Sequence, residues 1–166
     1  MYTDKLNPAL EIQQYFIKNN LTLSCAESCS GGLLAAALTH HAGSSKFFIA
    51  GLVTYSNQAK NKLLFVDIEL IEKFGAVSGE VASLMADNCR MLCQTDYSLS
   101  ITGIAGPSGD DKTNQVGLIY IGLSCINATK LKKFLFSGTR EEIRQQSVLA
   151  ALEFLLEETA LTKQYR

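Results

Sequence analysis

The sequence predicts an α/β fold, a three-layer α/β/α arrangement with a mixed, mostly parallel central sheet ending in an antiparallel hairpin. Apolar, β-prone runs alternate with helical segments along the chain, which is typical of strands joined by crossover helices. These runs are apolar throughout, as expected for a sheet covered by helices on both faces. The last two runs flank a turn at Asn127-Ala128, and this predicts the closing hairpin.

The predicted helices carry start and stop signals that depend only on nearby residues. Asn7-Pro8 begins the first, with Asn as the cap and Pro in the first helical position. Asp67 and Ser78 cap later helices, and Gly75 stops one of them. Thr139 to Glu142 is a capping box that opens the last helix. The predicted helices are residues 7–20, 30–40, 57–64, 67–75, 78–93 and 139–158.

The predicted strands are residues 21–26, 47–55, 97–102, 116–124 and 130–136, and a glycine-rich loop, residues 103–115, follows the third. Polar side chains stand at the ends of the first three: Ser28, Tyr55 and Thr102. Because ligands of open α/β sheets bind outside the carboxyl ends of the strands, we expect these side chains to share a site.

Composition indicates one globular domain, residues 1–166, with 47% hydrophobic and 19% charged residues. The net charge of −1 argues against an extended nucleic-acid surface, so we expect no nucleic-acid partner. No apolar run reaches membrane-spanning length, and the polar N-terminus does not resemble a signal peptide. Five cysteines without an export signal favour free thiols in a reducing cytoplasm.

The segment Ala26–Gly32 (AESCSGG) joins the first strand to the second helix. Its glycines permit a tight turn, and backbone N–H groups at the helix start favour negative charge. A hydroxyl held here can attack an electrophile while amides stabilise the oxyanion. Ser28 is therefore the candidate nucleophile. The alternative is that this serine is an ordinary helix cap.

Several segments, in order, carry a resemblance to a known family: Ala26–Gly32, Gly43–Ser45, Thr54–Lys60 (TYSNQAK), Gly75–Ser78, Thr102–Pro107 (TGIAGP), Val116–Gly117 and Ser137–Arg140. The chain resembles the C-terminal domain of the CinA (competence/damage-inducible) family, whose catalytic members are nicotinamide-nucleotide amidohydrolases. The resemblance implies deamidation of nicotinamide mononucleotide in pyridine nucleotide salvage, without metal or cofactor. The resemblance covers nearly the whole chain, and the chain is most similar to a stand-alone form of the domain.

The resemblance favours Ser28, Tyr55 and Lys60 as catalytic residues, with Lys60 deprotonating Ser28 directly or through Tyr55. The lysine pKa, ordinarily about 10.4, must then be lowered by burial or by a cation such as Lys62. Arg140 is a candidate phosphate clamp because its fork matches phosphate oxygens; the alternative is pairing with Glu141. The expected substrate-binding residues are Glu27, Ser30, Gly31, Gly32, Thr102, Gly103, Gly106 and Arg140.

Other chemistries receive less support from the sequence. Cys29 is the rival nucleophile. His40 and His41, the only histidines, are expected roughly 15 Å from Ser28, too far to be its base. The pairs Cys25/Cys29 and Cys89/Cys93 have no histidine near them in sequence, so no zinc site is expected. Residues 106–113 (GPSGDDKT) miss a P-loop by one residue, since Asp111 replaces its second glycine.

The chain departs from the CinA pattern in the loop after Gly109, where Asp110 and Gln115 replace residues usual in the family. Ser30 and Thr139 are milder departures, from Thr and Asp. The altered loop keeps a second hypothesis open, a non-catalytic nucleotide-binding or regulatory module linked to competence or DNA damage. The apolar positions between Leu149 and Leu156 would suit either the core or a homo-oligomer contact.

Overall fold

The computed structural model describes residues 7–109 and 115–163 and confirms the predicted fold class. A five-stranded sheet has the order β2-β1-β3-β4-β5. The strands β2 (Phe48–Val53), β1 (Leu23–Glu27) and β3 (Tyr97–Gly103) are parallel. The hairpin of β4 (Leu118–Cys125) and β5 (Thr129–Leu135) adds antiparallel pairings, so only β4 runs against the others.

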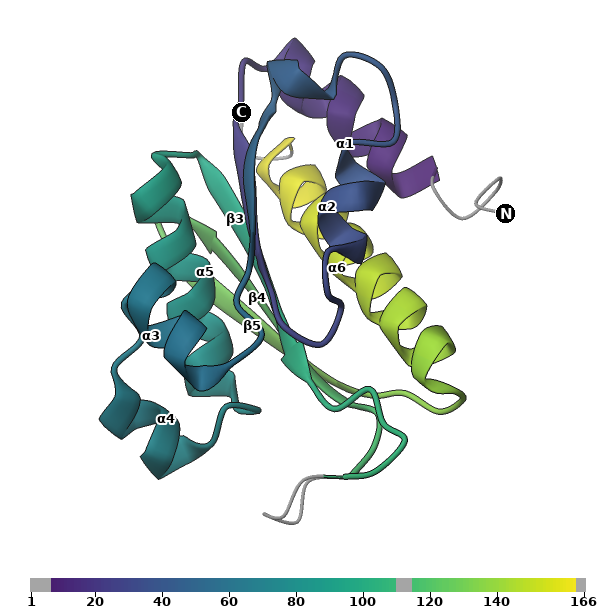
Figure 1. The fold of residues 1–166 in the computed structure, drawn as a ribbon. Helices are drawn as coiled ribbons and strands as arrows, with labels where there is room; N and C mark the ends of the chain where they lie inside the picture. The colour runs from purple at the N-terminus through teal and green to yellow at the C-terminus, as the bar shows by residue number, and fades with distance from the viewer. Residues whose placement is uncertain (1–6, 110–114, 164–166) are drawn as a thin grey trace.

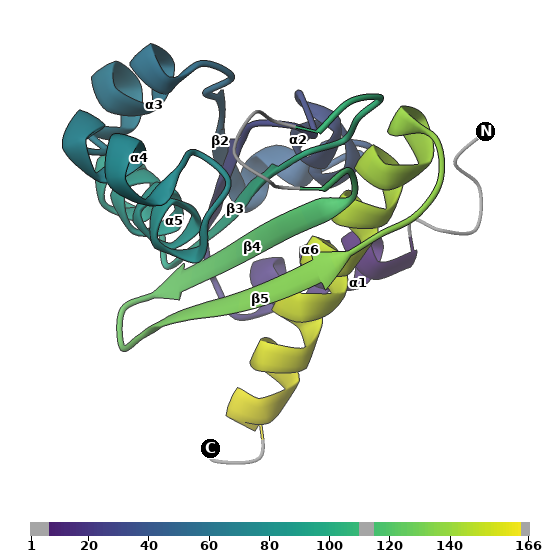
Figure 2. The same ribbon diagram turned by 90° about the horizontal axis from the view of Figure 1, so that it is seen from below.

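Helices cover both faces of the sheet (Figures 1 and 2). One face carries α1 (Asn7–Lys18), α2 (Leu33–Leu38) and α6 (Arg140–Lys163), and the other carries α3 (Asn57–Leu64), α4 (Ile68–Phe74) and α5 (Gly79–Cys93). The crossovers β1-α2-β2 and β2-α3-α4-α5-β3 run in opposite directions along the sheet. They therefore lie on opposite faces, as expected when both are right-handed.

Each face has its own apolar core. The larger core lies between the sheet and α1, α2 and α6, and includes Phe16, Leu99 and Phe154. The smaller one packs α3, α4 and α5 around Val66 and Met85. On that face α5 approaches β4 closely because Gly122 has no side chain: a Cβ there would lie 2.7 Å from the Ala82 carbonyl oxygen.

The caps predicted for α4, α5 and α6 agree with the structure, whereas α1 already includes Asn7, the residue predicted to cap it. Asp67 accepts a hydrogen bond from the Glu69 N–H (2.9 Å), and Ser78 accepts one from the Val81 N–H. Thr139 and Glu142 form the reciprocal capping box of α6. Bounds that depend on tertiary packing differ from the predictions. Helix α2 begins at Leu33 and ends at Leu38, whereas residues 30–40 were predicted.

The short η1 (Ser44–Lys46) precedes β2. Helix α6 runs to Lys163, five residues beyond the predicted end at Glu158. In residues 7–109 and 115–163, no helix is both long and apolar enough to cross a membrane.

One edge of the sheet collects the segments that carry the predicted site. Strands β1, β2 and β3 all end there, and α6 begins there after β5. The expected convergence of Ser28, Tyr55 and Thr102 is therefore built into the topology.

Candidate active site

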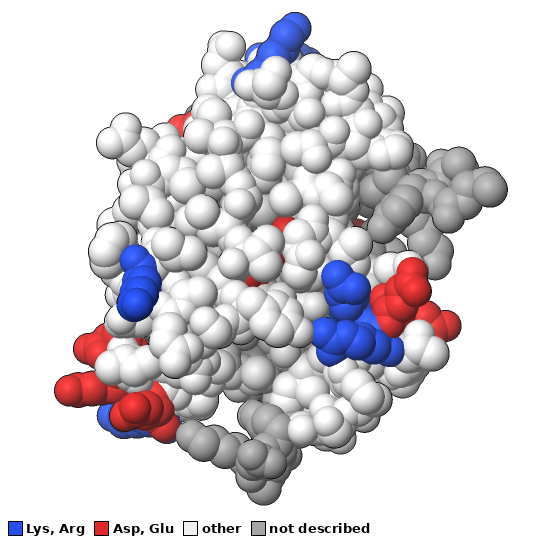
Figure 3. Space-filling model, in the orientation of Figure 1, with Lys and Arg blue, Asp and Glu red and all other residues white. Residues whose placement is uncertain are grey.

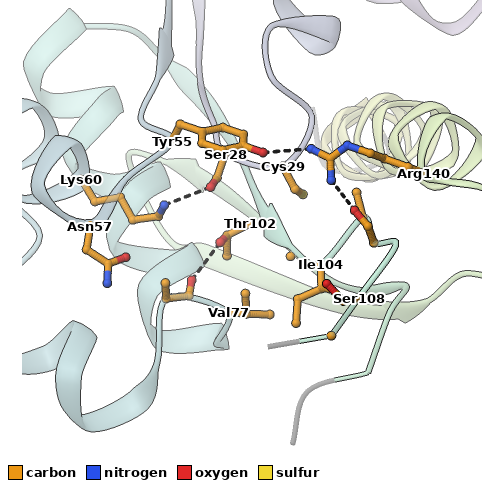
Figure 4. Close-up of a pocket in the computed structure, with 15 residues that line it drawn as sticks. Ser28, Cys29, Tyr55, Asn57, Lys60, Val77, Thr102, Ile104, Ser108 and Arg140 are labelled. Atoms are coloured by element: carbon orange, nitrogen blue, oxygen red, sulfur yellow. Dashed lines mark hydrogen bonds between the residues drawn. The ribbon is translucent and has the colours of Figure 1, made fainter. Parts of the chain in front are cut away.

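Ser28 and Lys60 lie in direct contact at this edge. The side-chain nitrogen of Lys60, Nζ, donates a hydrogen bond to the Ser28 Oγ at 3.0 Å (Figure 4). It also donates a 2.9 Å hydrogen bond to the Thr54 carbonyl. Both side chains are buried, with 8% of Ser28 and 1% of Lys60 exposed. A hydroxyl and an amine at this distance have the geometry required of a nucleophile and its base.

Local structure places each member of this pair. Ser28 follows the last residue of β1, and its N–H donates to the Ile101 carbonyl on β3 (2.9 Å). Lys60 lies in the first turn of α3, whose start is fixed by the Ser56 hydroxyl accepting from the Ala59 N–H (3.0 Å). Because helical side chains lean toward the N-terminus, Lys60 points back to the sheet edge.

Burial lowers the pKa of Lys60 from 10.5 to about 8, and a smaller opposing effect comes from Cys29. Desolvation penalises the charged form of the amine. The other predicted cause, the cation of Lys62, does not apply, since that side chain is exposed on α3. With a pKa near 8, about a tenth of Lys60 is neutral at pH 7 and able to accept a proton.

Tyr55 and Arg140 form a second pair at the same edge. Tyr55 is 60% exposed, and its hydroxyl accepts a 2.9 Å hydrogen bond from Arg140 (Figure 4). Arg140 also donates to the Gly106 carbonyl, so it joins α6 to the loop after β3. The Tyr55 hydroxyl thus faces Arg140, whereas Lys60 reaches Ser28 directly. Arg140 does not pair with Glu141, whose carboxylate accepts from Gln145.

Both pairs line one cavity of about 280 Å³. Of the residues expected to form the site, it contains seven: Ser28, Tyr55, Lys60, Thr102, Gly103, Gly106 and Arg140. Besides Cys29, the lining includes seven residues that were not among the expected site residues: Asn57, Ala76, Val77, Ile104, Ala105, Ser108 and Gly109. Asn57 precedes Lys60 by three residues on α3, and this helical spacing was the signal that could have identified it.

Four of the expected substrate-binding residues lie outside the cavity lining: Glu27, Ser30, Gly31 and Gly32. The Glu27 carboxylate is fully buried and bonded to backbone N–H groups of α2. Gly31 and Gly32 have φ of +58° and +95°, which glycine adopts without strain, and they turn the chain from β1 into α2. The Ser30 hydroxyl is buried.

A family model places this architecture among known proteins. The model of the CinA C-terminal domain matches residues 6–159. The chain belongs to the CinA family. A putative competence-damage inducible protein of Thermoanaerobacter pseudethanolicus is 47% identical over 138 residues, which are 83% of this chain and 33% of that protein. A CinA-like protein of Endomicrobium trichonymphae is 49% identical over 84% of this chain and 32% of its own.

The CinA-family chain therefore spans about a third of the length of these curated relatives. Solved structures of the family share its fold across almost their full length. The competence/damage inducible protein CihA of Agrobacterium tumefaciens superposes with a TM-score of 0.89 at 38% identity, covering 93% of this chain and 94% of that one. A CinA superfamily protein of Escherichia coli gives 0.89 at 34%, covering 92% and 88%.

Cys29, the rival nucleophile, also lines the cavity of this CinA domain. Burial raises the pKa of its thiol to about 11, whereas a nucleophilic cysteine needs a lowered pKa to form its thiolate. No group of three or more His, Cys, Asp or Glu residues suited to a metal ion occurs in the described part of the chain. Residues 110–114, which include most of the altered loop and half of the P-loop-like segment, lie outside the described residues.

Proposed function

We propose that this CinA-family chain is an amidohydrolase that converts nicotinamide mononucleotide to nicotinate mononucleotide and ammonia, using a Ser28–Lys60 pair and no metal. The observation that carries the proposal is the 3.0 Å contact between Lys60 Nζ and Ser28 Oγ inside a cavity, with the lysine pKa lowered to about 8. A buried amine that is partly neutral near pH 7 is suited to activate a hydroxyl. The choice of substrate rests on the family resemblance.

The proposed reaction has two steps. Neutral Lys60 takes the Ser28 hydroxyl proton as Oγ attacks the carboxamide carbon of the substrate. Lys60 then gives this proton to the departing nitrogen, so the C–N bond breaks, ammonia leaves and an acyl ester remains on Ser28. In the second step Lys60 takes a proton from water, hydroxide attacks the ester, and the proton returns to Ser28 as nicotinate mononucleotide is released. Direct contact makes Lys60 the proton carrier, so Tyr55 need not relay the proton.

Charge on the attacked oxygen has a candidate stabiliser in the turn after Ser28. The N–H of Cys29 follows the nucleophile, the usual place for an oxyanion-hole donor. This N–H and that of Ser30 face the Cys29 thiol, a weak acceptor that a developing oxyanion would replace. The α2 amides further along are already bonded to Glu27.

The cavity also offers binding groups that suit a nucleotide. Val77 and Ile104 supply apolar surface for a flat ring, and Asn57 supplies an amide. Arg140 uses one N–H on Tyr55 and one on Gly106; a guanidinium has five such donors, so others can serve a phosphate. Figure 3 shows charged side chains, basic and acidic together, gathered at the right and at the lower left of a face that is otherwise mostly uncharged.

The test is release of ammonia from nicotinamide mononucleotide in the presence of a chelator, by wild type, Ser28→Ala and Cys29→Ala. We expect wild type and Cys29→Ala to be active and Ser28→Ala to lose at least about 10³-fold in kcat, as when a nucleophile is removed. Mass spectrometry of the quenched reaction should find the acyl group on the peptide that contains Ser28. Equal activity of Ser28→Ala would refute the mechanism. Inactive wild type that still binds the nucleotide would favour the regulatory binding module.

A further inference from the structure

Glu27 has an unusual position for a buried acid. Its side chain is completely buried, beside the candidate nucleophile in sequence but outside the cavity. One carboxylate oxygen accepts from the N–H groups of Gly32 (3.0 Å) and Leu34 (3.1 Å), and the other accepts from Ala35 (2.8 Å). A carboxylate with three such bonds is well compensated for its burial.

This carboxylate supplies a cap that helix α2 otherwise lacks. Gly32, at the N-cap position, has no side chain and therefore makes no side-chain cap bond. The acceptor comes instead from the end of β1, five residues back along the chain. The bond to Gly32 joins the residue before the Ser28–Gly32 turn to the last residue of the turn, so both ends of the turn are held in place. On the outer side, Arg144 of α6 donates to the Ser30 carbonyl (2.8 Å) and holds the same turn.

The main chain of Glu27 holds the other half of the catalytic pair. Its carbonyl accepts from the Thr54 N–H (2.8 Å), and the Thr54 carbonyl in turn accepts from Lys60 Nζ (2.9 Å). One residue therefore connects both the turn that bears the nucleophile and the carbonyl that orients the base. The Glu27 side chain fixes the turn, and the Glu27 backbone carbonyl fixes Thr54, whose own carbonyl accepts from Lys60.

We propose that Glu27 is a positioning residue for hydrolysis, whose carboxylate holds the Ser28–Gly32 turn so that Ser28 Oγ faces Lys60 Nζ. Because its bonds go to the Gly32, Leu34 and Ala35 N–H groups, the Cys29 and Ser30 N–H groups stay available to the reaction. This inference rests on the proposed role of Ser28. Glu27 also assists burial in raising the pKa of the Cys29 thiol, which keeps the neighbouring sulfur protonated.

A residue that positions the nucleophile without touching substrate should affect kcat and spare KM. Glu27→Ala removes all three bonds from backbone N–H groups and the weak one from the Cys25 thiol. We expect kcat to fall about 10²-fold, the loss typical of a displacement of about 1 Å at a reacting group. Glu27→Gln keeps one acceptor oxygen and should lose less. The matched control is Asp67→Ala, which removes an acidic cap from the short helix α4 away from the cavity; it should leave kcat unchanged.

Two measurements separate this inference from the choice of substrate. The first is kcat and KM for ammonia release from nicotinamide mononucleotide. The second is the rate at which a fluorophosphonate labels Ser28, measured by peptide mass spectrometry, which needs no substrate. We expect slower labelling of both Glu27 variants and a wild-type rate for Asp67→Ala. If wild type labels but does not hydrolyse the nucleotide, the proposed substrate fails while labelling of the variants still decides the role of Glu27.

Wild-type labelling and kcat in folded Glu27→Ala would overturn the proposal, and so would a raised KM with unchanged kcat. Circular dichroism establishes that each variant is folded. If Glu27→Ala does not fold, Glu27→Gln decides: a wild-type labelling rate there refutes the positioning role. A wild-type protein that takes no label at Ser28 refutes both the premise and the inference.

Discussion

Replacing Lys60 by Met tests whether burial controls the base. The change removes the amine and keeps an unbranched apolar stem in the same space. Burial lowers the lysine pKa from 10.5 to about 8, a difference equivalent to about 3 kcal/mol at about 1.36 kcal/mol per pKa unit. At pH 7 nearly all of this free energy destabilises the folded state, because Lys60 is mostly protonated in both the folded and the unfolded states.

The sign of the pH dependence follows from this lowered pKa. Between pH 8 and 10.5 the unfolded chain binds more protons than the folded chain, so wild-type stability rises with pH. With these two pKa values, the free-energy cost of burying Lys60 falls from about 3 kcal/mol at pH 7 to about 2 kcal/mol at pH 9. Lys60→Met also leaves Ser28 Oγ and the Thr54 carbonyl without their donor, at a pH-independent cost of about 1–3 kcal/mol.

The assay is urea unfolding of wild type, Lys60→Met and Lys62→Met at pH 7 and pH 9. From pH 7 to pH 9, we expect the free energy of unfolding of wild type to rise by about 1 kcal/mol relative to that of Lys60→Met. Lys62 is exposed on the same helix, so Lys62→Met should follow wild type. In parallel, wild-type kcat/KM should rise about tenfold per pH unit below pH 8 and level off above it. A difference in stability between wild type and Lys60→Met that stays constant from pH 7 to pH 9 would refute the reasoning.

Two further predictions concern the second pair and the start of α6. Tyr55→Phe removes the hydroxyl bonded to Arg140 and leaves the Ser28–Lys60 contact intact. We therefore expect kcat to fall less than about tenfold, below the contribution typical of a general acid or base. A larger loss in steady-state kinetics would restore Tyr55 as the proton relay. Glu142 has a pKa lowered from 4.5, first by the Thr139 N–H and then by its hydroxyl. Its contribution to stability is present above pH 4.5 and lost as the pH falls through the folded-state pKa. The difference in Tm between wild type and Glu142→Gln should therefore shrink from pH 7 to pH 3. The same difference in Tm at both pH values, measured by circular dichroism, would contradict the prediction.

Features that depend on neighbouring residues were predictable from the sequence. The caps at Asp67 and Ser78 and the Thr139–Glu142 box are formed by bonds across two or three residues, so composition within one turn decides them. The fold class followed from apolar runs and their connections. The segment that bears Ser28 could be assigned to a strand–helix junction because glycine and serine have specific conformational preferences.

Only the tertiary structure decided which polar side chains line the cavity and which support it from outside. Glu27 and Ser28 are adjacent, yet successive side chains at the end of a strand point in different directions, so one caps α2 and the other enters the cavity. Tyr55 is near Lys60 in sequence but bonds to Arg140, which lies 85 residues away.

The sequence by itself thus determined the fold class, several helix caps and a short list of candidate site residues. The contact of Lys60 with Ser28, across 32 residues, and the burial that lowers its pKa were decided by packing of α3 against the edge of the sheet. The physical reason is that a pKa depends on the solvent and charges around a group in space. Local pattern specifies which residues are present, whereas the chain path specifies what surrounds them.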